Sequence, residues 1–243
     1  MTTALTADVQ SVKTRARDLV LLAFTFSSGA IDAISFLALG GVFAAFMTGN
    51  VAFLGLRVAG ARSPYAAAIL AAMAAFVVGV YLSAHIVKRS EGSRVFWPRH
   101  VTLALGLSLV PQLLFVAVWS AMDGEPPHDV VPVLLGFWGL AMGMQSAAIR
   151  RLHVEGVFTT AATATVIVLV TDLTSWSATA EERLRLGGIL LCLFAGATAG
   201  GLLLVHAPLS APDLSLVVSA AATATALVVF RERDAPDEWR TRR

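Results

Sequence analysis

Charged residues are scarce in this sequence. Asp, Glu, Lys and Arg make up 14% of the 243 residues, while 57% are hydrophobic and the mean hydropathy is +0.76. Soluble domains carry about a quarter charged residues, so this deficit excludes an ordinary water-soluble protein. The net charge is only +2. The sequence therefore also lacks the strongly basic face that binds nucleic acid.

Cysteine and the common catalytic motifs are equally scarce. The single cysteine, Cys192, lies in an apolar run and has no partner for an intrachain disulfide. The sequence contains no Walker loop, GxSxG elbow, HExxH, dinucleotide fingerprint or CxxC. Its histidines and carboxylates show no metal-ligand spacing. We therefore expect no enzyme activity, no cofactor and no metal site.

Long apolar runs fill the sequence instead. A helix needs about 20 mostly apolar residues to cross a bilayer, and the runs here are continuous and rich in Ala and Leu rather than alternating. This pattern predicts an all-α membrane protein, a polytopic helical bundle in contact with lipid. The apolar segments are 19–39, 42–58, 65–87, 101–122, 131–149, 156–173, 187–207 and 214–230.

The eight segments form two similar groups of four. Residues 29–51 resemble residues 143–166, and Gly79 to His85 resembles Gly200 to His206. These matches indicate an internal duplication. The predicted organisation comprises an N-terminal segment 1–18, a first membrane repeat 19–122, a loop 123–130, a second repeat 131–230 and an Arg-rich tail 231–243.

The distribution of Lys and Arg predicts how the segments cross. If all eight segments span the membrane, basic residues are spread over both sides, whereas cytoplasmic loops normally hold the excess. If segments 42–58 and 156–173 enter and return, only Arg57 and Arg62 lie outside and both termini are cytoplasmic. Each half then has three full spans plus one short broken segment, so the halves are inverted repeats. A full crossing by either short segment stays an alternative.

Asp32 is a carboxylate inside the first apolar run. Placing an acidic side chain at the bilayer centre costs about 2.5 to 3.5 kcal/mol, so such a residue pairs, faces the bundle interior or is protonated. One interpretation is proton coupling or cation binding. The other is a structural carboxylate near the outer end that hydrogen-bonds a neighbouring helix.

The polar residues of the two short segments predict a binding site. Thr48, Gly49 and Asn50 combine a flexible backbone position with hydrogen-bonding side chains, which suits a broken helix facing a cavity. The alternative is a helix cap or a close helix crossing. The equivalent residues of the second half are Thr163 and Thr165, with Gln145 and Ser146 in the neighbourhood that matches Ile31 and Asp32. We expect the two breaks to meet near the membrane midplane.

The stretch from Gly29 to Asn50 resembles the signature of the YoaK-type family of multipass bacterial inner-membrane proteins. The elements are GxxD at Gly29 to Asp32, GxVF at Gly40 to Phe43, and TGN at Thr48 to Asn50. This resemblance covers most of residues 19–230 and implies an inner-membrane location and a transporter or permease with a small-molecule or ion substrate. A non-transporting scaffold or partner subunit is the alternative. Self-association of the chain stays open.

Overall fold

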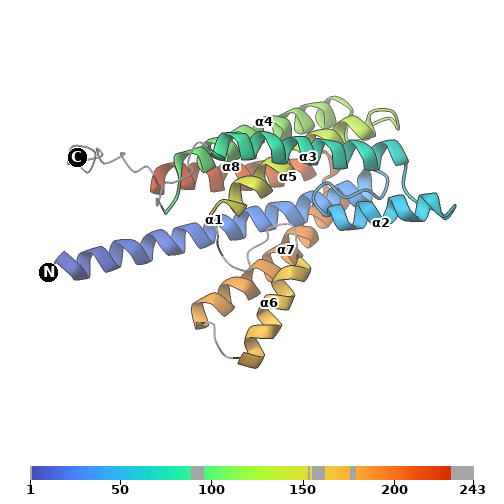
Figure 1. Cartoon of the computed structure of the whole chain (residues 1–243). Helices are drawn as coiled ribbons and strands as arrows, with labels where there is room; N and C mark the ends of the chain where they lie inside the picture. Colours follow the sequence, from blue (N-terminus) through green and yellow to red (C-terminus); the bar gives the residue numbers. More distant parts are fainter. Residues whose placement is uncertain (1, 89–95, 153, 155–161, 176–178, 231–243) are drawn as a thin grey trace.

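The computed structural model is all-helical over the residues that it describes, which are 2–88, 96–152, 154, 162–175 and 179–230. Its long helices lie side by side in a bundle (Figure 1). The helices in chain order are α1 Thr2–Ala38, α2 Met47–Val58, α3 Ala66–Lys88, α4 Arg99–Ala121, α5 Val131–Arg150, α6 Ala162–Ser175, α7 Ala180–His206, the short 3-10 turn η1 Pro208–Ser210, and α8 Ala211–Val229.

Six of these helices are long and apolar enough to cross a membrane: α1 from Ser11, α3, α4, α5, α7, and α8 together with η1. The helices α2 and α6 are much shorter. The predicted fold class, an all-α polytopic membrane bundle, is therefore confirmed. Two helices begin earlier than the apolar runs indicate.

The early helix starts have local causes. α1 extends back through the polar segment 1–18, which contains no Gly or Pro to interrupt a helix. α7 starts at Ala180, seven residues before its apolar run, because Thr179 and Glu182 form a capping box. The Thr179 amide donates to the Glu182 carboxylate at 2.8 Å, and the Glu182 amide donates to the Thr179 hydroxyl at 3.3 Å.

Two hydrophobic clusters mark the ends of the bundle and fix the helix directions. The cluster around Trp97, the Trp97 end, takes residues from the starts of α1, α4 and α7 and from the ends of α3, α5 and α8. The cluster around Trp119, the Trp119 end, takes residues from the opposite ends of the same helices. The helices α1, α4 and α7 therefore run in one direction, and α3, α5 and α8 run in the other.

The helix directions show on which side of the bundle each short helix lies. α1 ends and α3 begins at the Trp119 end, so the segment containing α2 returns the chain to the side from which it came. α5 ends and α7 begins at the Trp97 end, so the segment containing α6 does the same at the opposite side. Six crossings, rather than eight, agree with this arrangement.

Helix packing repeats when α1–α4 are exchanged for α5–α8. The most extensive contacts are α3 with α5 and α1 with α7, followed by α1 with α8 and α4 with α5. The short helices follow the same rule, because α2 packs on α3 and α6 packs on α7. Equivalent helices thus have equivalent neighbours, although α1 and α5 run in opposite directions.

Glycines place the helix axes of the equivalent pairs close together. A Cβ on Gly79 of α3 would meet the carbonyl of Leu140 in α5, and one on Gly196 of α7 would meet the carbonyl of Phe26 in α1. Small residues at such crossings let helix backbones approach closely. Gly79 therefore corresponds to Gly196. The sequence match of Gly79 with Gly200 is one helical turn out of register.

Candidate functional site

Asp32 holds the connection between α1 and α2. Its carboxylate oxygen Oδ1 accepts a hydrogen bond of 2.7 Å from the amide of Ala45, and the neighbouring amides of Ala44 and Phe46 face the same carboxylate. Successive backbone N–H groups of this kind form a concave anion site. Asp32 is the last polar residue but one of α1, and its carboxylate anchors the loop at the Trp119 end. The bond reaches the loop that follows α1 and not a neighbouring helix.

Asn50 holds the same loop from the other side. Its amide nitrogen Nδ2 donates to the carbonyl of Phe43 at 2.7 Å, and its oxygen Oδ1 accepts from the amide of Phe43 at 3.1 Å. The side chain is fully buried. Asp32 and Asn50, with the backbone of residues 43–46 between them, form one unit that we name the loop clamp.

The irregular backbone lies earlier than the sequence predicts. Thr48, Gly49 and Asn50 form the first turn of α2, while the non-helical stretch runs from 39 to 46. Gly40 and Gly41 have φ of 78° and 81°, a conformation that favours glycine and ends α1. The role of Gly49 is packing, because a Cβ there would approach the Phe46 ring to 2.8 Å. Thr48 is exposed.

Gln145 and Ser146 lie away from the loop clamp. Gln145 is fully buried in α5, and its Nε2 donates to the carbonyl of Phe24 at 3.3 Å. Phe24 precedes Asp32 by eight residues, about 12 Å along α1 at 1.5 Å per residue. The Ser146 hydroxyl has no hydrogen-bond partner among the described residues. Gln145 therefore belongs to a different layer of the bundle.

Thr163 and Thr165 lie in the first turn of α6, as Thr48 and Asn50 lie in the first turn of α2. Thr163 is exposed and Thr165 is buried. The loop before α6, residues 155–161, is outside the described residues. The Asp172 carboxylate accepts from Arg183 Nε at 2.8 Å, which joins α6 to α7.

The two short helices do not meet. Within the described residues, α2 packs on α3 and α6 packs on α7, with no extensive packing of α2 on α6. Figure 1 shows α2 beside the end of α1, and α6 beside α7. The predicted meeting of the two segments at the midplane is therefore not found. Each segment returns to its own side of the bundle, and that separates α2 from α6.

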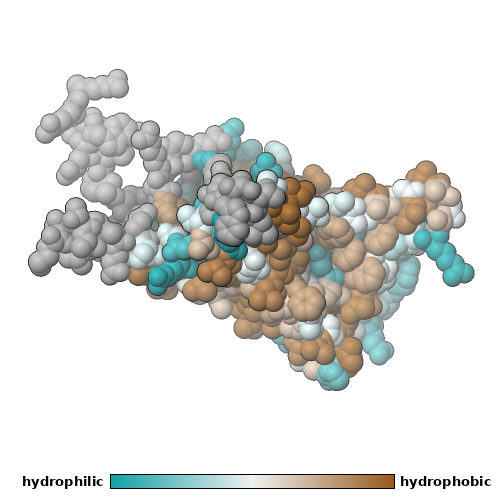
Figure 2. Space-filling model, turned by 90° about the horizontal axis from the view of Figure 1, so that it is seen from below, coloured by the Kyte–Doolittle hydropathy of each residue, from teal (hydrophilic) through white to brown (hydrophobic). Residues whose placement is uncertain are grey.

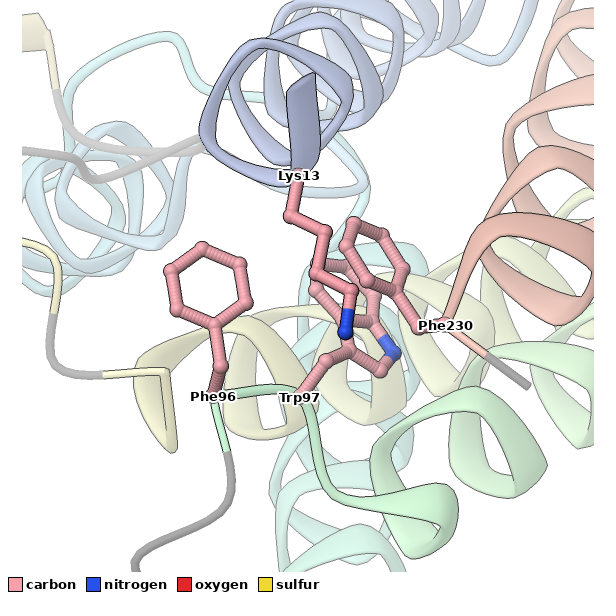
Figure 3. Close-up of a pocket in the computed structure, with 4 residues that line it drawn as sticks. All are labelled: Lys13, Phe96, Trp97 and Phe230. Atoms are coloured by element: carbon pink, nitrogen blue, oxygen red, sulfur yellow. The ribbon is translucent and has the colours of Figure 1, made fainter. Parts of the chain in front are cut away.

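A small hollow at the Trp97 end was not foreseen from the sequence. It is lined by Lys13, Phe96, Trp97 and Phe230. Figure 3 shows the Lys13 side chain reaching from α1 toward Trp97 and Phe230, whose rings stack at 4.4 Å. The Arg17 guanidinium lies 5.1 Å from the centre of the Phe96 ring. Aromatic and basic residues that gather at a helix end are typical of a membrane–water interface.

The apolar outer surface indicates where lipid contacts the bundle. Only 17% of the apolar window of α7 is buried, and Leu184, Phe194 and Val205 have exposed fractions of 76%, 70% and 72%. In Figure 2, brown apolar residues cover much of the middle of one face, and teal hydrophilic residues gather toward its margins. Such a surface is stable in hydrocarbon and not in water. The membrane-spanning helices therefore contact the bilayer.

Comparison with known proteins gives the family and no activity. No solved structure matches the chain. A curated relative, the UPF0700 transmembrane protein YoaK of Bacillus subtilis (strain 168), is 30% identical over 157 residues, which is 65% of this chain and 67% of the relative. Residues 20–229 match the family described as "Protein of unknown function (DUF1275)", a match that includes all six membrane-spanning helices almost completely. The chain is therefore a multi-pass membrane protein that belongs to the DUF1275 family, as the resemblance to the YoaK-type pattern predicted.

Proposed function

We propose that the protein is a transporter or permease for small solutes in the bacterial inner membrane, built from two inverted repeats. The observation that carries this proposal is the opposite direction of α1 and α5, which have equivalent packing partners. Inverted repeats with interrupted segments are a common transporter design, in which one half moves against the other around a central site. Both termini are cytoplasmic, and the Trp97 end faces the cytoplasm.

The short helices act as gates at opposite faces in this proposal. α2 closes the outer side and α6 the inner side, so each half contributes one gate. The loop clamp holds α2 in place through hydrogen bonds to the backbone, and Asp32 gives the outer gate an ionisable group through which ion movement is coupled to opening. The sequence carries no nucleotide-hydrolysing motif, so transport is passive or driven by an ion gradient.

One observation favours a second candidate, a non-transporting partner subunit. Asn50 is buried and uses both its amide groups on Phe43, and Asp32 uses its carboxylate on the loop. Residues occupied in this way stabilise a fold without binding a solute. The two candidates differ in whether α2 moves.

The test is solute uptake into liposomes that contain the purified protein, in a Cys192→Ala background. The probes are inorganic cations and anions, ammonium, urea and short carboxylates, each with and without a proton or sodium gradient. We expect uptake of at least one probe class. A bulky charged thiol adduct on Thr48→Cys, next to the loop clamp, should then block uptake.

The matched control is Val58→Cys, which carries the same adduct at the other end of α2, where the side chain is 91% exposed. This adduct should leave uptake unchanged. Folded protein that moves no probe, or uptake insensitive to the Thr48→Cys adduct, would contradict the gate and favour the partner subunit. Reporter fusions after Arg62, Asp123 and His206 should report outside, and those after Arg183 and the tail should report inside.

A further inference from the structure

Five fully buried polar side chains in the bundle interior carry hydrogen-bonding atoms without a partner among the described residues; one is Ser83 of α3, and the other four lie on α1, α4 and α5. The atoms of these four are the Ser28 hydroxyl of α1, the Gln112 carbonyl oxygen of α4, and the Trp138 ring N–H and Gln145 carbonyl oxygen of α5. Buried polar atoms are nearly always paired, with protein or with water. Lipid supplies no partner at this depth.

The amide orientations of the two glutamines are fixed by their other bonds. Gln145 points its nitrogen at the Phe24 carbonyl, 3.3 Å away, and Gln112 points its nitrogen at the carbonyl of Ser108, 3.4 Å away. Turning either amide over would place two oxygens against each other. Each glutamine therefore keeps a carbonyl oxygen that needs a donor.

The helix register brings the four side chains to neighbouring levels. The Phe115 ring of α4 stacks on Trp138 of α5 with centroids 3.6 Å apart. α4 and α5 run in opposite directions, so Gln112 lies about 4.5 Å and Gln145 about 10 Å from that level, both toward the Trp97 end.

α1 reaches the same layer. The bond from Gln145 sets the level of Phe24, and Ser28 lies one turn closer to the Trp119 end, about level with Gln112. The four side chains therefore fall within about 10 Å of one another along the bundle axis, on α5 and on the two helices α1 and α4 that contact it. We name these four residues the inner polar site.

The inner polar site offers both donors and acceptors and no charge of its own. The Trp138 N–H is a donor only, the glutamine oxygens are acceptors, and the Ser28 hydroxyl serves as either. The nearest carboxylate along α1 is Asp32, one turn beyond Ser28, and it is occupied by the amides of residues 44–46. A neutral molecule with several N–H or O–H groups and at least one acceptor matches this set.

We propose that the inner polar site binds a small uncharged solute that both donates and accepts hydrogen bonds, of the urea, amide or polyol class, with water in its place when the solute is absent. The proposal deepens the proposed function, on which its role in transport rests. Ser28 lies one turn from Asp32, so release of the loop clamp opens the shortest route from the outer side to this site.

The test uses the full chain in detergent and in membranes, with Ser28→Cys in the Cys192→Ala background and methyl methanethiosulfonate as the probe. The matched control is Leu21→Cys, seven residues earlier on α1, where the side chain is equally buried but belongs to the apolar cluster of the Trp97 end, beyond the inner polar site. We expect Ser28→Cys to react about tenfold faster or more. Urea, well below the concentrations that unfold proteins, should slow that reaction, and sodium chloride should not.

Gln145→Met supplies the second readout, because it keeps the length of the side chain and removes the amide. The variant should leave Ser28→Cys reactive but abolish the protection by urea. If Ser28→Cys and Leu21→Cys both fail to react, the site is overturned. Protection by sodium chloride instead of urea overturns the assignment to an uncharged solute. If urea protects Ser28→Cys but the protein takes up no solute, the transport proposal is contradicted and the binding site is still supported.

Discussion

α2 is fastened to the end of α1, whereas α6 is fastened to the start of α7. The first attachment consists of side-chain bonds to backbone, from Asp32 and Asn50 to the loop at residues 43–46. The second includes an ion pair between Asp172 and Arg183. The helices occupy equivalent places in the two halves, and their chemistry differs.

The difference shows which features the two halves share. Equivalent helices pack on equivalent partners through glycines, so the scaffold is common to both. The short helices are where the halves diverge. Ser146 occupies the place of Asp32 in the second half. Its single neutral hydroxyl cannot accept hydrogen bonds from several backbone amides as the Asp32 carboxylate can. Substitutions can therefore disrupt either the helix contacts that both halves share or the separate attachments of α2 and α6.

The largest effect is expected from the shared scaffold. A Cβ on Gly143 of α5 would meet the Phe76 carbonyl of α3, and a backbone carbonyl in a helix cannot turn away. Gly143→Ala should therefore lower the free energy of unfolding by about 3 kcal/mol, the upper part of the usual overpacking cost. The measurement is thermal unfolding of the purified protein in detergent.

Gly136→Ala, in the same helix, is the control, because a Cβ there meets nothing within 4 Å. The equivalent experiment at the contact between α1 and α7 pairs Gly29→Ala with Gly187→Ala, since Gly29 faces the Leu193 carbonyl and Gly187 is open. The Gly29 and Gly143 variants should lose similar stability. If Gly143→Ala left the unfolding temperature unchanged, α3 and α5 would have to be further apart in solution.

Removing the Asp32 carboxylate should cause the next largest loss of stability. Asp32→Ala leaves the Ala45 amide and its neighbours without their acceptor, and an unmet buried hydrogen bond costs about 1 to 3 kcal/mol. Asp32→Asn keeps one oxygen and should lose less. Amide hydrogen exchange of residues 40–50 should rise in Asp32→Ala while exchange in α6 stays unchanged. Equal exchange in the wild type and Asp32→Ala would show that the carboxylate does not hold the loop.

Asn50 tests the other side of the loop clamp with a smaller expected effect. Asn50→Ala removes both bonds to Phe43, at 2.7 and 3.1 Å, whereas Asn50→Asp removes only the donor. We expect a loss of about 1 to 2 kcal/mol for Asn50→Ala. Because both residues hold one loop, the double variant with Asp32→Ala should lose less than the sum of the single losses. Full additivity would show that the two residues act separately.

The ion pair between α6 and α7 should contribute least to stability. Arg183 is 23% exposed and Asp172 is 6% exposed, so the attraction of this largely buried pair is offset by the cost of removing both charges from water, and we expect a net contribution of about 0.2 to 1 kcal/mol. A double-mutant cycle of Arg183→Met and Asp172→Asn, followed by thermal unfolding, should give a coupling in that range that weakens with salt. A coupling larger than that of the loop clamp would reverse the comparison and make α6 the more firmly held of the short helices.

The pattern of apolar residues was sufficient to predict the membrane spans. Runs such as 65–87 and 131–149 become α3 and α5 with ends within one residue, because a crossing helix must be continuously apolar and about 20 residues long. The Lys and Arg distribution predicted six crossings for a different reason: cytoplasmic loops hold the excess of basic residues, and six crossings keep nearly all of them on one side. The helical extension of α1 through residues 2–18 was not predicted, since a polar segment has no hydropathy signal.

The polar residues were harder to interpret. Asp32 and Asn50 both bond to the loop between α1 and α2, and their separation of fewer than 20 residues in sequence makes this proximity easy to anticipate. Their bonds to backbone were not predictable, since composition does not show which amides a loop presents. The relation of Gln145 to Ser28 and Gln112 was missed for a similar reason. It depends on the register of three helices that meet only after folding.

Hydropathy along the chain is enough to establish the bilayer as solvent, the all-helical class and the six spans, because each follows from local sequence and the cost of exposing polar groups to lipid. The positions of α2 and α6 on opposite sides, the loop clamp and the inner polar site depend on how the helices pack. Glycines permit the close approach of α3 to α5 and of α1 to α7, and the rotation of each helix at those contacts then selects which polar side chains are buried together.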